Sequence, residues 1–438
     1  MTEPIDVLIV GGGMITHDQL LPSIYHLQRL GVVGTISISA LNARPLKELA
    51  EAPDLVEAFP GQSFTPFPGF HRVDPDTRFP DLYKEAIASL KPDNVVVVAV
   101  PDPLHYLVIL EALNRDQNVL CVKPLVQKYA EGQEIDRVAK ARGLYVGVEY
   151  HKRFDRRALL AKKDYAAGRF GEFKIGEARL VESWSYRFSN FQNWFTKENS
   201  DPFTYVGCHY VDQVYFVTNL RPTQVSVRGL EGAFPNGNIG YLWSLGVVTF
   251  ENGAILSIIN GLGYPDDGAG SNDQGLTLFC EGGEKGSIIR HNDQFRGVAH
   301  CYITGTGPGG KHYNYINPDY LRLLPWQGKG LKPVGYGYDS IDANMSAIRH
   351  LKSFASFERN RPKRASASRE FLDELSVTVL LDLRRGFLKE VDRRGIIATP
   401  ANSYINELVT EAARLSIGAG GTSVDIKYDP TPHVLIQT

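Results

Sequence analysis

The feature that most constrains the fold is the stretch VLIVGGGMIT, in which an apolar run ends abruptly in glycines. Glycine at such a strand-to-helix turn lets the backbone approach a bound pyrophosphate, which then lies on the positive end of the helix. Gly11 and Gly13 occupy the first two glycine positions of G-x-G-x-x-G, and Thr16 stands at the third. We therefore expect a dinucleotide site lined by Gly11, Gly13, Met14 and Ile15.

The alternation that begins at this turn continues through residues 5 to 148. Short runs such as NVVVVAV are apolar at every position, and longer segments of helical periodicity separate them. Strands without a polar face belong to a parallel sheet that helices cover on both sides. Residues 1–148 are therefore predicted to form an α/β Rossmann dinucleotide-binding domain with a doubly wound parallel sheet.

A different pattern follows Tyr150. Stretches such as TQVSVRGLEG alternate apolar and polar residues, as antiparallel strands with one solvated face do. A chain of 438 residues is long enough for two domains. We expect residues 149–395 to form an α+β domain, built on an open, mostly antiparallel sheet, for substrate binding and oligomerisation. The tail, residues 396–438, is expected to pack back on the first domain.

The composition excludes several classes of partner. The 47 Lys and Arg residues nearly balance the 49 Asp and Glu residues, so no net field attracts nucleic acid or an anionic membrane. The apolar runs are too short to span a bilayer, and the N-terminus has no signal-peptide pattern, so we expect a cytoplasmic protein. The cysteines are widely spaced, without His at ligand spacing, which predicts buried free thiols and no metal site. They are Cys121, Cys208, Cys280 and Cys301.

The end of the second predicted strand bears on the choice of dinucleotide. Asn42 stands where an Asp or Glu would hold the adenine ribose, and Arg44 follows two positions later. An amide can bond a 2'-hydroxyl, whereas a guanidinium can pair with a 2'-phosphate. The residues therefore predict NAD or NADP and leave the choice open. An Arg44 that stacks on the adenine or faces water is an equal alternative.

Two later strands also end in residues suited to a ligand. VAVPDPLH ends a strand at Pro101 and begins a helix near His105, and VLCVKPL ends a strand at Lys123. Ligands of an open α/β sheet lie beyond the carboxyl ends of its strands, so these three residues are expected to face the cofactor. An ammonium there can reach a substrate hydroxyl. A lysine that extends from a strand end into solvent is the ordinary alternative.

A predicted helix in the second half carries a candidate acid–base group. DPFTYVGCHYVDQVYF places Tyr205, His209 and Asp212 on one helical face. His209 can exchange a proton near neutral pH, and Asp212 can fix its tautomer from the next turn. Three polar residues at the edge of a core are the alternative interpretation.

Taken in order, VGGGMIT, VAVPDPLH, VLCVKPL, YVGVEYHKRF and YVGCHYVDQVYF resemble the glucose-fructose oxidoreductase, inositol dehydrogenase and MocA-like (Gfo/Idh/MocA) family. The resemblance covers the first half of the chain motif by motif and the remainder by architecture. It implies a Rossmann domain, a second domain with an open antiparallel sheet, and a homodimer or homotetramer. The family's Glu-Lys-Pro signature appears here as Val122-Lys123-Pro124, without the carboxylate.

The resemblance also implies roles for the candidate residues. Lys123 and His209 act together on the reacting hydroxyl, and Tyr205 stands where the family has the Asp of Asp-x-x-x-His. In VEYHKRFD, Tyr150 and Arg153 become candidates for substrate contact, while Glu149 and His151 are left as equally structural. The complete set of expected substrate contacts is Lys123, Tyr150, Arg153, Tyr205, His209 and Asp212.

These features predict an NAD(P)-dependent oxidoreductase that transfers hydride between nicotinamide and a carbinol carbon of a sugar, glycoside or cyclic polyol. His209 or Lys123 exchanges the hydroxyl proton, and Tyr205 completes the relay. Two alternatives stay open. A redox-neutral, NAD-dependent glycoside hydrolase or lyase would use the same lysine through a transient keto-sugar. A non-catalytic dinucleotide-binding sensor would have lost Lys123 or His209, and the sequence keeps both.

Overall fold

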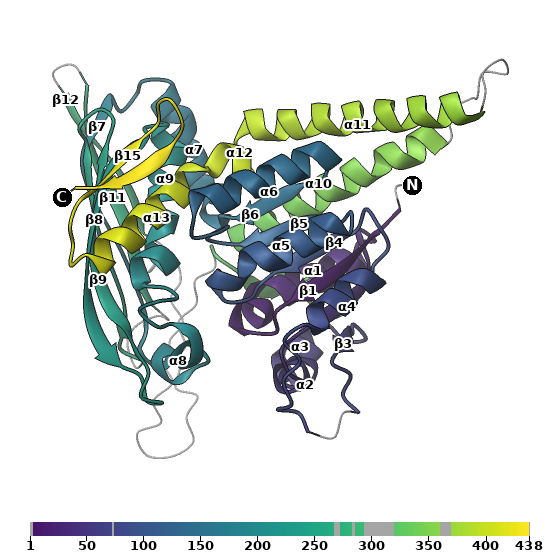
Figure 1. Cartoon of the computed structure of the whole chain (residues 1–438). Coiled ribbons are helices and arrows are strands. Elements are labelled where there is room, and N and C mark those ends of the chain that lie inside the picture. The colour runs from purple at the N-terminus through teal and green to yellow at the C-terminus, as the bar shows by residue number, and fades with distance from the viewer. Residues whose placement is uncertain are drawn as a thin grey trace. The chain divides into compact units, whose positions relative to one another are not determined.

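The computed structural model describes residues 3–71, 74–266, 272–282, 285–292, 319–359 and 369–437. The chain forms two compact units, and each unit combines segments that are distant in the sequence (Figure 1). Unit 1 comprises Met1–Leu125, Ala130–Glu149 and Leu323–Asn402. Unit 2 comprises Val126–Tyr129, Tyr150–Arg322 and Ser403–Thr438.

Unit 1 contains a parallel sheet in the order β3-β2-β1-β4-β5-β6, which confirms the predicted doubly wound Rossmann sheet. Its strands are β1 (Ile5–Val10), β2 (Val33–Ser39), β3 (Thr65–Phe67), β4 (Val95–Val98), β5 (Asn118–Val122) and β6 (Val146–Glu149). Every residue of β4 is buried, because helices cover both faces of a central parallel strand.

The helices of unit 1 follow the strands in the alternation that the sequence predicts. They are η1 (Thr16–Leu20), α1 (Leu21–Arg29), α2 (Arg44–Glu51), α3 (Pro53–Ala58), α4 (Leu82–Ser89), η2 (Asp102–Leu104), α5 (His105–Asn114), α6 (Tyr129–Arg142), α10 (Tyr336–Arg359), α11 (Arg369–Arg394) and α12 (Pro400–Ser403). A short hairpin of β13 (Arg322–Pro325) and β14 (Leu331–Val334) precedes α10.

Unit 2 contains a sheet in the order β12-β11-β7-β10-β9-β8-β15-β16. Only the β7–β10 pair among the described strand pairs of this sheet is parallel, so the expected mostly antiparallel sheet is confirmed. The strands are β7 (Glu172–Ser183), β8 (Pro222–Ala233), β9 (Ile239–Phe250), β10 (Ile255–Tyr264), β11 (Asn272–Gly282), β12 (Lys285–Asn292), β15 (Val424–Lys427) and β16 (His433–Ile436).

Helices lie against one face of this sheet (Figure 1). They include η3 (His151–Phe154), α7 (Arg156–Ala166), η4 (Trp184–Phe188), α8 (Phe191–Trp194), η5 (Phe203–Gly207), α9 (Cys208–Thr218) and α13 (Ile405–Gly418). Val211 of α9 and Leu408 of α13 share a buried core with Val248 of β9. Leu245 and Val247, on the opposite face of the same strand, are exposed.

The boundaries of the two units correct the expected domain limits. The stretch 323–395, expected in the second domain, belongs to unit 1, because Ile341, Met345 and Ile348 of α10 complete the buried core around the parallel sheet. The tail, expected to pack back on the first domain, belongs to unit 2 from Ser403 onward. Its strand β15 pairs with β8 and extends the antiparallel sheet.

Two expectations about the whole chain meet the structure only in part. None of the described helices is long and apolar enough to cross a membrane. Cys121, Cys208 and Cys280 are buried thiols that form no disulfide, whereas Cys301 lies outside the described residues.

Candidate functional site

The glycine turn after β1 has the geometry that a dinucleotide requires. Gly11 has φ +121°, and a Cβ there would lie 2.0 Å from the carbonyl oxygen of Ala99, so only glycine fits. A Cβ on Gly13 would meet nothing within 4 Å, which leaves the surface of the turn open. Thr16 is buried and donates its hydroxyl to Gly11 O at 2.7 Å. The third motif position therefore braces the turn, although it is not glycine.

The residues around this turn fit a bound dinucleotide. Met14 is exposed, whereas Ile15 packs partly buried against the unit 1 core. Helices η1 and α1 follow the turn directly, so their backbone N–H groups begin where a pyrophosphate would lie. The backbone of the turn can hold the phosphates, and the dinucleotide would supply a hydride acceptor.

The adenine end of the expected site contains an ion pair that the sequence did not reveal. Arg44, at the start of α2, donates Nε to Asp76 Oδ1 at 2.6 Å, and this hydrogen bond lowers the pKa of Asp76. The Arg44 backbone N–H also donates to Pro75 O at 3.1 Å. Asn42 is half-buried, and its Oδ1 has no hydrogen-bond partner among the described residues. The arginine is thus paired with a carboxylate, while the amide oxygen beside it is unsatisfied.

His105 connects the two strand-end turns of unit 1. Its ring is fully buried, with Nδ1 2.8 Å from Pro124 O and Nε2 2.8 Å from Val100 O. These contacts tie the turn at Pro101 to the cis peptide between Lys123 and Pro124. His105 therefore positions the two turns that carry Pro101 and Lys123, the residues that were expected with it. Lys123 is half-buried at the end of β5.

Glu149 is a buried carboxylate that the sequence left as structural. In the parallel pairing of β5 and β6, Glu149 lies beside Val122, the residue that replaces the signature glutamate. Its Oε1 accepts a hydrogen bond from Gln19 Nε2 at 2.9 Å. Strand β6 therefore carries a carboxylate beside Val122, the position at which this chain lacks the glutamate of the Glu-Lys-Pro signature.

In unit 2, His209 lies in a group of rings at the start of α9. The side chain is 5% exposed, and its ring centroid is 4.7 Å from that of His151 and 6.1 Å from that of Tyr150. His151 is half-buried and also contacts Tyr320, at 5.2 Å between centroids. Burial raises the pKa of Tyr150 well above its ordinary value, so this phenol stays neutral.

Arg153 and Asp212 form a buried ion pair. Arg153 donates Nε to Asp212 Oδ2 at 2.8 Å and Nη2 to Oδ1 at 2.5 Å, and Asn406 Nδ2 donates to the same Oδ1 at 2.8 Å. Both charged side chains are at most 2% exposed. Asp212 was expected beside His209 as a tautomer partner, and Arg153 was expected at the substrate. The structure shows that this ion pair joins η3 to α9.

Tyr205 lies in an aromatic cluster. It belongs to η5, the π-helical turn before α9, and its ring packs edge-on against Phe191, Trp194 and Phe195, with centroids 5.0 to 6.0 Å away. Asp201 fixes the start of this turn by accepting the Thr204 N–H at 2.9 Å. Tyr205 therefore lies on a π-helical turn, and His209 lies on the regular helix that follows it. The α-helical spacing assumed from the sequence does not apply across this junction.

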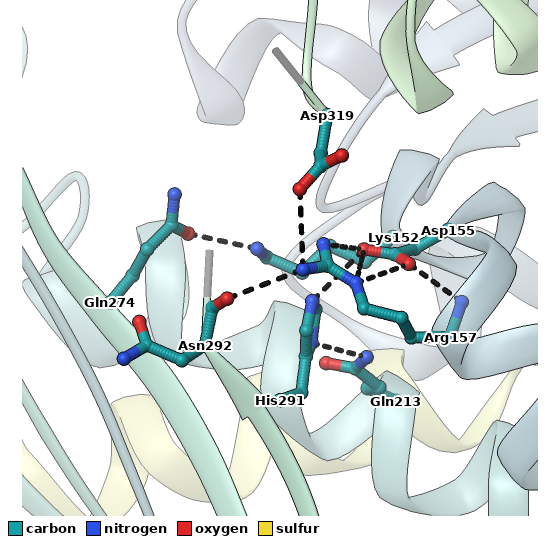
Figure 2. A network of polar contacts seen from close by, with 8 residues as sticks. All are labelled: Lys152, Asp155, Arg157, Gln213, Gln274, His291, Asn292 and Asp319. Carbon is teal, nitrogen blue, oxygen red and sulfur yellow. Dashed lines mark hydrogen bonds and ion pairs between the residues drawn. The ribbon is translucent and has the colours of Figure 1, made fainter. Parts of the chain in front are cut away.

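A polar network anchors the residues that follow His151 (Figure 2). Asp155 Oδ2 lies 2.9 Å from His291 Nε2, and Gln213 Nε2 lies 2.9 Å from His291 Nδ1. Gln213 and Asp155 thus hold the His291 ring by its two nitrogens. Burial alone would raise the pKa of Asp155, but the hydrogen bonds from His291 and Arg157 hold it well below its usual value.

The same network extends to two further elements. Arg157 pairs with Asp155 and also contacts Asn292 O and Asp319 Oδ2, each at 3.3 Å. Lys152 donates Nζ to Gln274 Oε1 at 2.8 Å (Figure 2). Within the described residues, no cluster of three or more His, Cys, Asp or Glu side chains is arranged to hold a metal ion.

Comparisons with known proteins match both halves of the chain. Residues 5–150 match the model described as oxidoreductase family, NAD-binding Rossmann fold, and residues 159–288 match the GFO/IDH/MocA C-terminal domain. An inositol 2-dehydrogenase of Rubrobacter xylanophilus is 25% identical over 300 residues, which are 63% of this chain and 78% of the relative. An oxidoreductase of Schizosaccharomyces pombe is 35% identical over 123 residues, or 27% of this chain.

The chain spans only 32% and 39% of the two fission-yeast oxidoreductases that it matches. The crystal structure of GenD2 from gentamicin A biosynthesis, in complex with NAD, has a TM-score of 0.62 and 16% identity. It covers 98% of this chain, and the alignment includes 97% of GenD2. This likeness shows the fold, and the family model identifies the N-terminal part as an NAD-binding Rossmann domain.

Proposed function

Because the chain belongs to the Gfo/Idh/MocA oxidoreductase family, we propose that it is an NAD-dependent dehydrogenase acting on a carbinol carbon of a sugar, glycoside or cyclic polyol. The turn at Gly11 and Gly13 carries the proposal, since a side chain on Gly11 would collide with the backbone of Ala99 and the surface at Gly13 is open. The substrate class is supported by the inositol 2-dehydrogenase of Rubrobacter xylanophilus.

The proposed chemistry divides between an ammonium and an imidazole. Lys123 donates a hydrogen bond to the substrate hydroxyl and stabilises negative charge on that oxygen. His209 takes the hydroxyl proton while hydride leaves the same carbon. Exchanging the roles of Lys123 and His209 is the alternative assignment. Tyr205 and Tyr150 are proposed to line the substrate site, with Arg153 and Asp212 forming part of its wall.

The adenine end favours NAD over NADP. Arg44 is the guanidinium closest in sequence to the expected ribose position, and it is paired with Asp76. A 2'-phosphate would have to break this pair and would meet the Asp76 carboxylate. We therefore propose NAD as the preferred cofactor.

Lys123→Met and His209→Asn provide the test. The full-length enzyme is assayed with NAD and a panel of inositols, hexoses and glucosides, by following the absorbance of reduced nicotinamide. Each variant is expected to lower kcat by about 10²- to 10⁴-fold, the usual contribution of an acid–base or charge-stabilising group. Binding of NAD, measured by calorimetry, should change little.

The same assay discriminates the alternatives. Full turnover by Lys123→Met would contradict the catalytic assignment. Cleavage of a glucoside without accumulation of reduced cofactor would establish the redox-neutral hydrolase or lyase instead. NAD binding without turnover of any member of the panel would favour the sensor.

We also propose that the protein is a homo-oligomer that forms through the uncovered face of the unit 2 sheet. Four apolar residues pair across neighbouring strands on this face and are 42 to 56% exposed. They are Ile255, Ile175, Phe279 and Ile288, and this set is called the sheet row below. A contiguous apolar surface of this kind is typical of an interface.

A further inference from the structure

His209 has a second imidazole as its neighbour, and the two differ in access to solvent. The His209 side chain is 5% exposed, whereas His151 is half-buried. Their ring centroids are 4.7 Å apart with the planes inclined at 43°. A buried base that takes a proton in each turnover must also release it, and His151 is the group of the pair that reaches the surface.

Two other polar groups near His209, Tyr150 and Asp212, are poorly suited to accept that proton. Tyr150 packs edge-on against the His209 ring, but burial raises its pKa and keeps the phenol neutral. Asp212, one turn further along α9, already accepts hydrogen bonds from Arg153 and Asn406. Protonating Asp212 would leave the buried Arg153 guanidinium without its counter-charge, which is strongly unfavourable.

The fold holds His151 in place from both sides. The next two residues, Lys152 and Arg153, are bonded to Gln274 on β11 and Asp212 on α9. Tyr320 covers the His151 ring at 5.2 Å. This anchoring fixes a half-buried imidazole against a buried one.

We propose that His151 acts through His209 as its proton-relay and positioning residue. The proposal rests on the dehydrogenase function above. On oxidation, hydride leaves the carbinol carbon for the nicotinamide, and the hydroxyl proton passes to His209. It then passes to His151 and to water, so that the site ends with a carbonyl product, reduced cofactor and one released proton. On reduction, the proton travels the same path inward.

His151→Phe tests the relay, because phenylalanine keeps a ring between His209 and Tyr320 but carries no nitrogen. We expect kcat to fall about 10- to 100-fold, within the range of general acid–base effects, with KM for NAD unchanged. Added imidazole should restore part of kcat in His151→Ala, whose small side chain leaves room for it, which a purely structural role would not allow. His433→Phe, an exposed histidine of β16, is the matched control and should turn over normally.

A second measurement does not depend on turnover. In ¹⁵N-histidine NMR of the full chain, the ring proton of His209 should exchange with water more slowly in His151→Phe than in the wild type, because the path through His151 is removed. This result supports the relay even where no substrate is found. Unchanged exchange in His151→Phe overturns it even where the enzyme is active.

Discussion

At the scale of single residues, unit 2 contains a carboxylic acid in an unusual environment. Glu407 of α13 is 1% exposed, and its Oε1 has no hydrogen-bond partner among the described residues. Burial raises the pKa of Glu407 from 4.5 to about 8, with Asp212 adding to the increase and Arg153 opposing it. The residue is therefore protonated at neutral pH.

This raised pKa makes stability depend on pH. The unfolded chain ionises Glu407 near 4.5, whereas the folded chain keeps the proton up to about 8. The contribution of protonated Glu407 to stability is therefore complete below pH 4.5 and is lost as the pH rises through about 8. We predict that Glu407→Gln raises the Tm at pH 9 by about 3 °C or more and flattens its dependence on pH. Thermal unfolding from pH 5 to 9 measures this, with the exposed Glu57→Gln as control. Parallel curves for Glu407→Gln and wild type would refute the prediction.

At the scale of elements, the sequence predicts those whose pattern is local. Strand β1, its glycine turn and the buried strands β4 and β5 are where periodicity and turn chemistry place them. The sequence places α10 in the second domain, whereas the helix belongs to unit 1. An amphipathic helix specifies that one face is buried but not against which sheet. The partner of Asp212 was missed for the same reason: helical spacing aligns it with His209, but Arg153 approaches from another element.

The network at η3 and α7 yields a prediction about these elements. Asp155 caps α7 by accepting the Arg157 N–H at 2.8 Å, and it also binds His291. We predict that Asp155→Asn lowers the free energy of unfolding by about 3 kcal/mol, the usual cost of breaking a buried ion pair. Because folding lowers the pKa of Asp155, its contribution to stability is fully present above pH 3.8, the ordinary value for this group. The contribution disappears as the pH falls through the lower pKa of the folded state.

Urea unfolding at pH 7 measures the effect of Asp155→Asn. The matched control is Asp81→Asn, which removes a surface pair with Lys84 whose carboxylate is 75% exposed. Exposed pairs contribute about 0 to 1 kcal/mol, so the control should unfold almost as the wild type does. Equal effects of the two variants would show that the η3 network does not anchor the turn.

At the scale of the whole molecule, the sheet row predicts assembly. Phe279→Lys and Ile255→Lys place a charge at the centre of the proposed interface, and burying an unpaired ammonium is unfavourable. Both variants should shift the mass measured by light scattering towards the monomer at micromolar concentration. Val56→Lys, on an apolar residue of α3 that is 55% exposed, is the control and should keep the wild-type mass. If light scattering shows that the wild-type protein is monomeric, the proposed homo-oligomer is wrong.

The chain passes repeatedly between the two units, and this connectivity governs how the protein is made. The core of the Rossmann sheet contains Ile341, Met345 and Ile348, which are synthesised long after β6 ends at Glu149. A nascent chain of 150 residues therefore contains all the parallel strands of unit 1 but exposes the apolar face that α10 later covers. That face stays exposed until about 190 further residues have been synthesised, and exposed apolar surface of this kind makes a folding intermediate prone to aggregation.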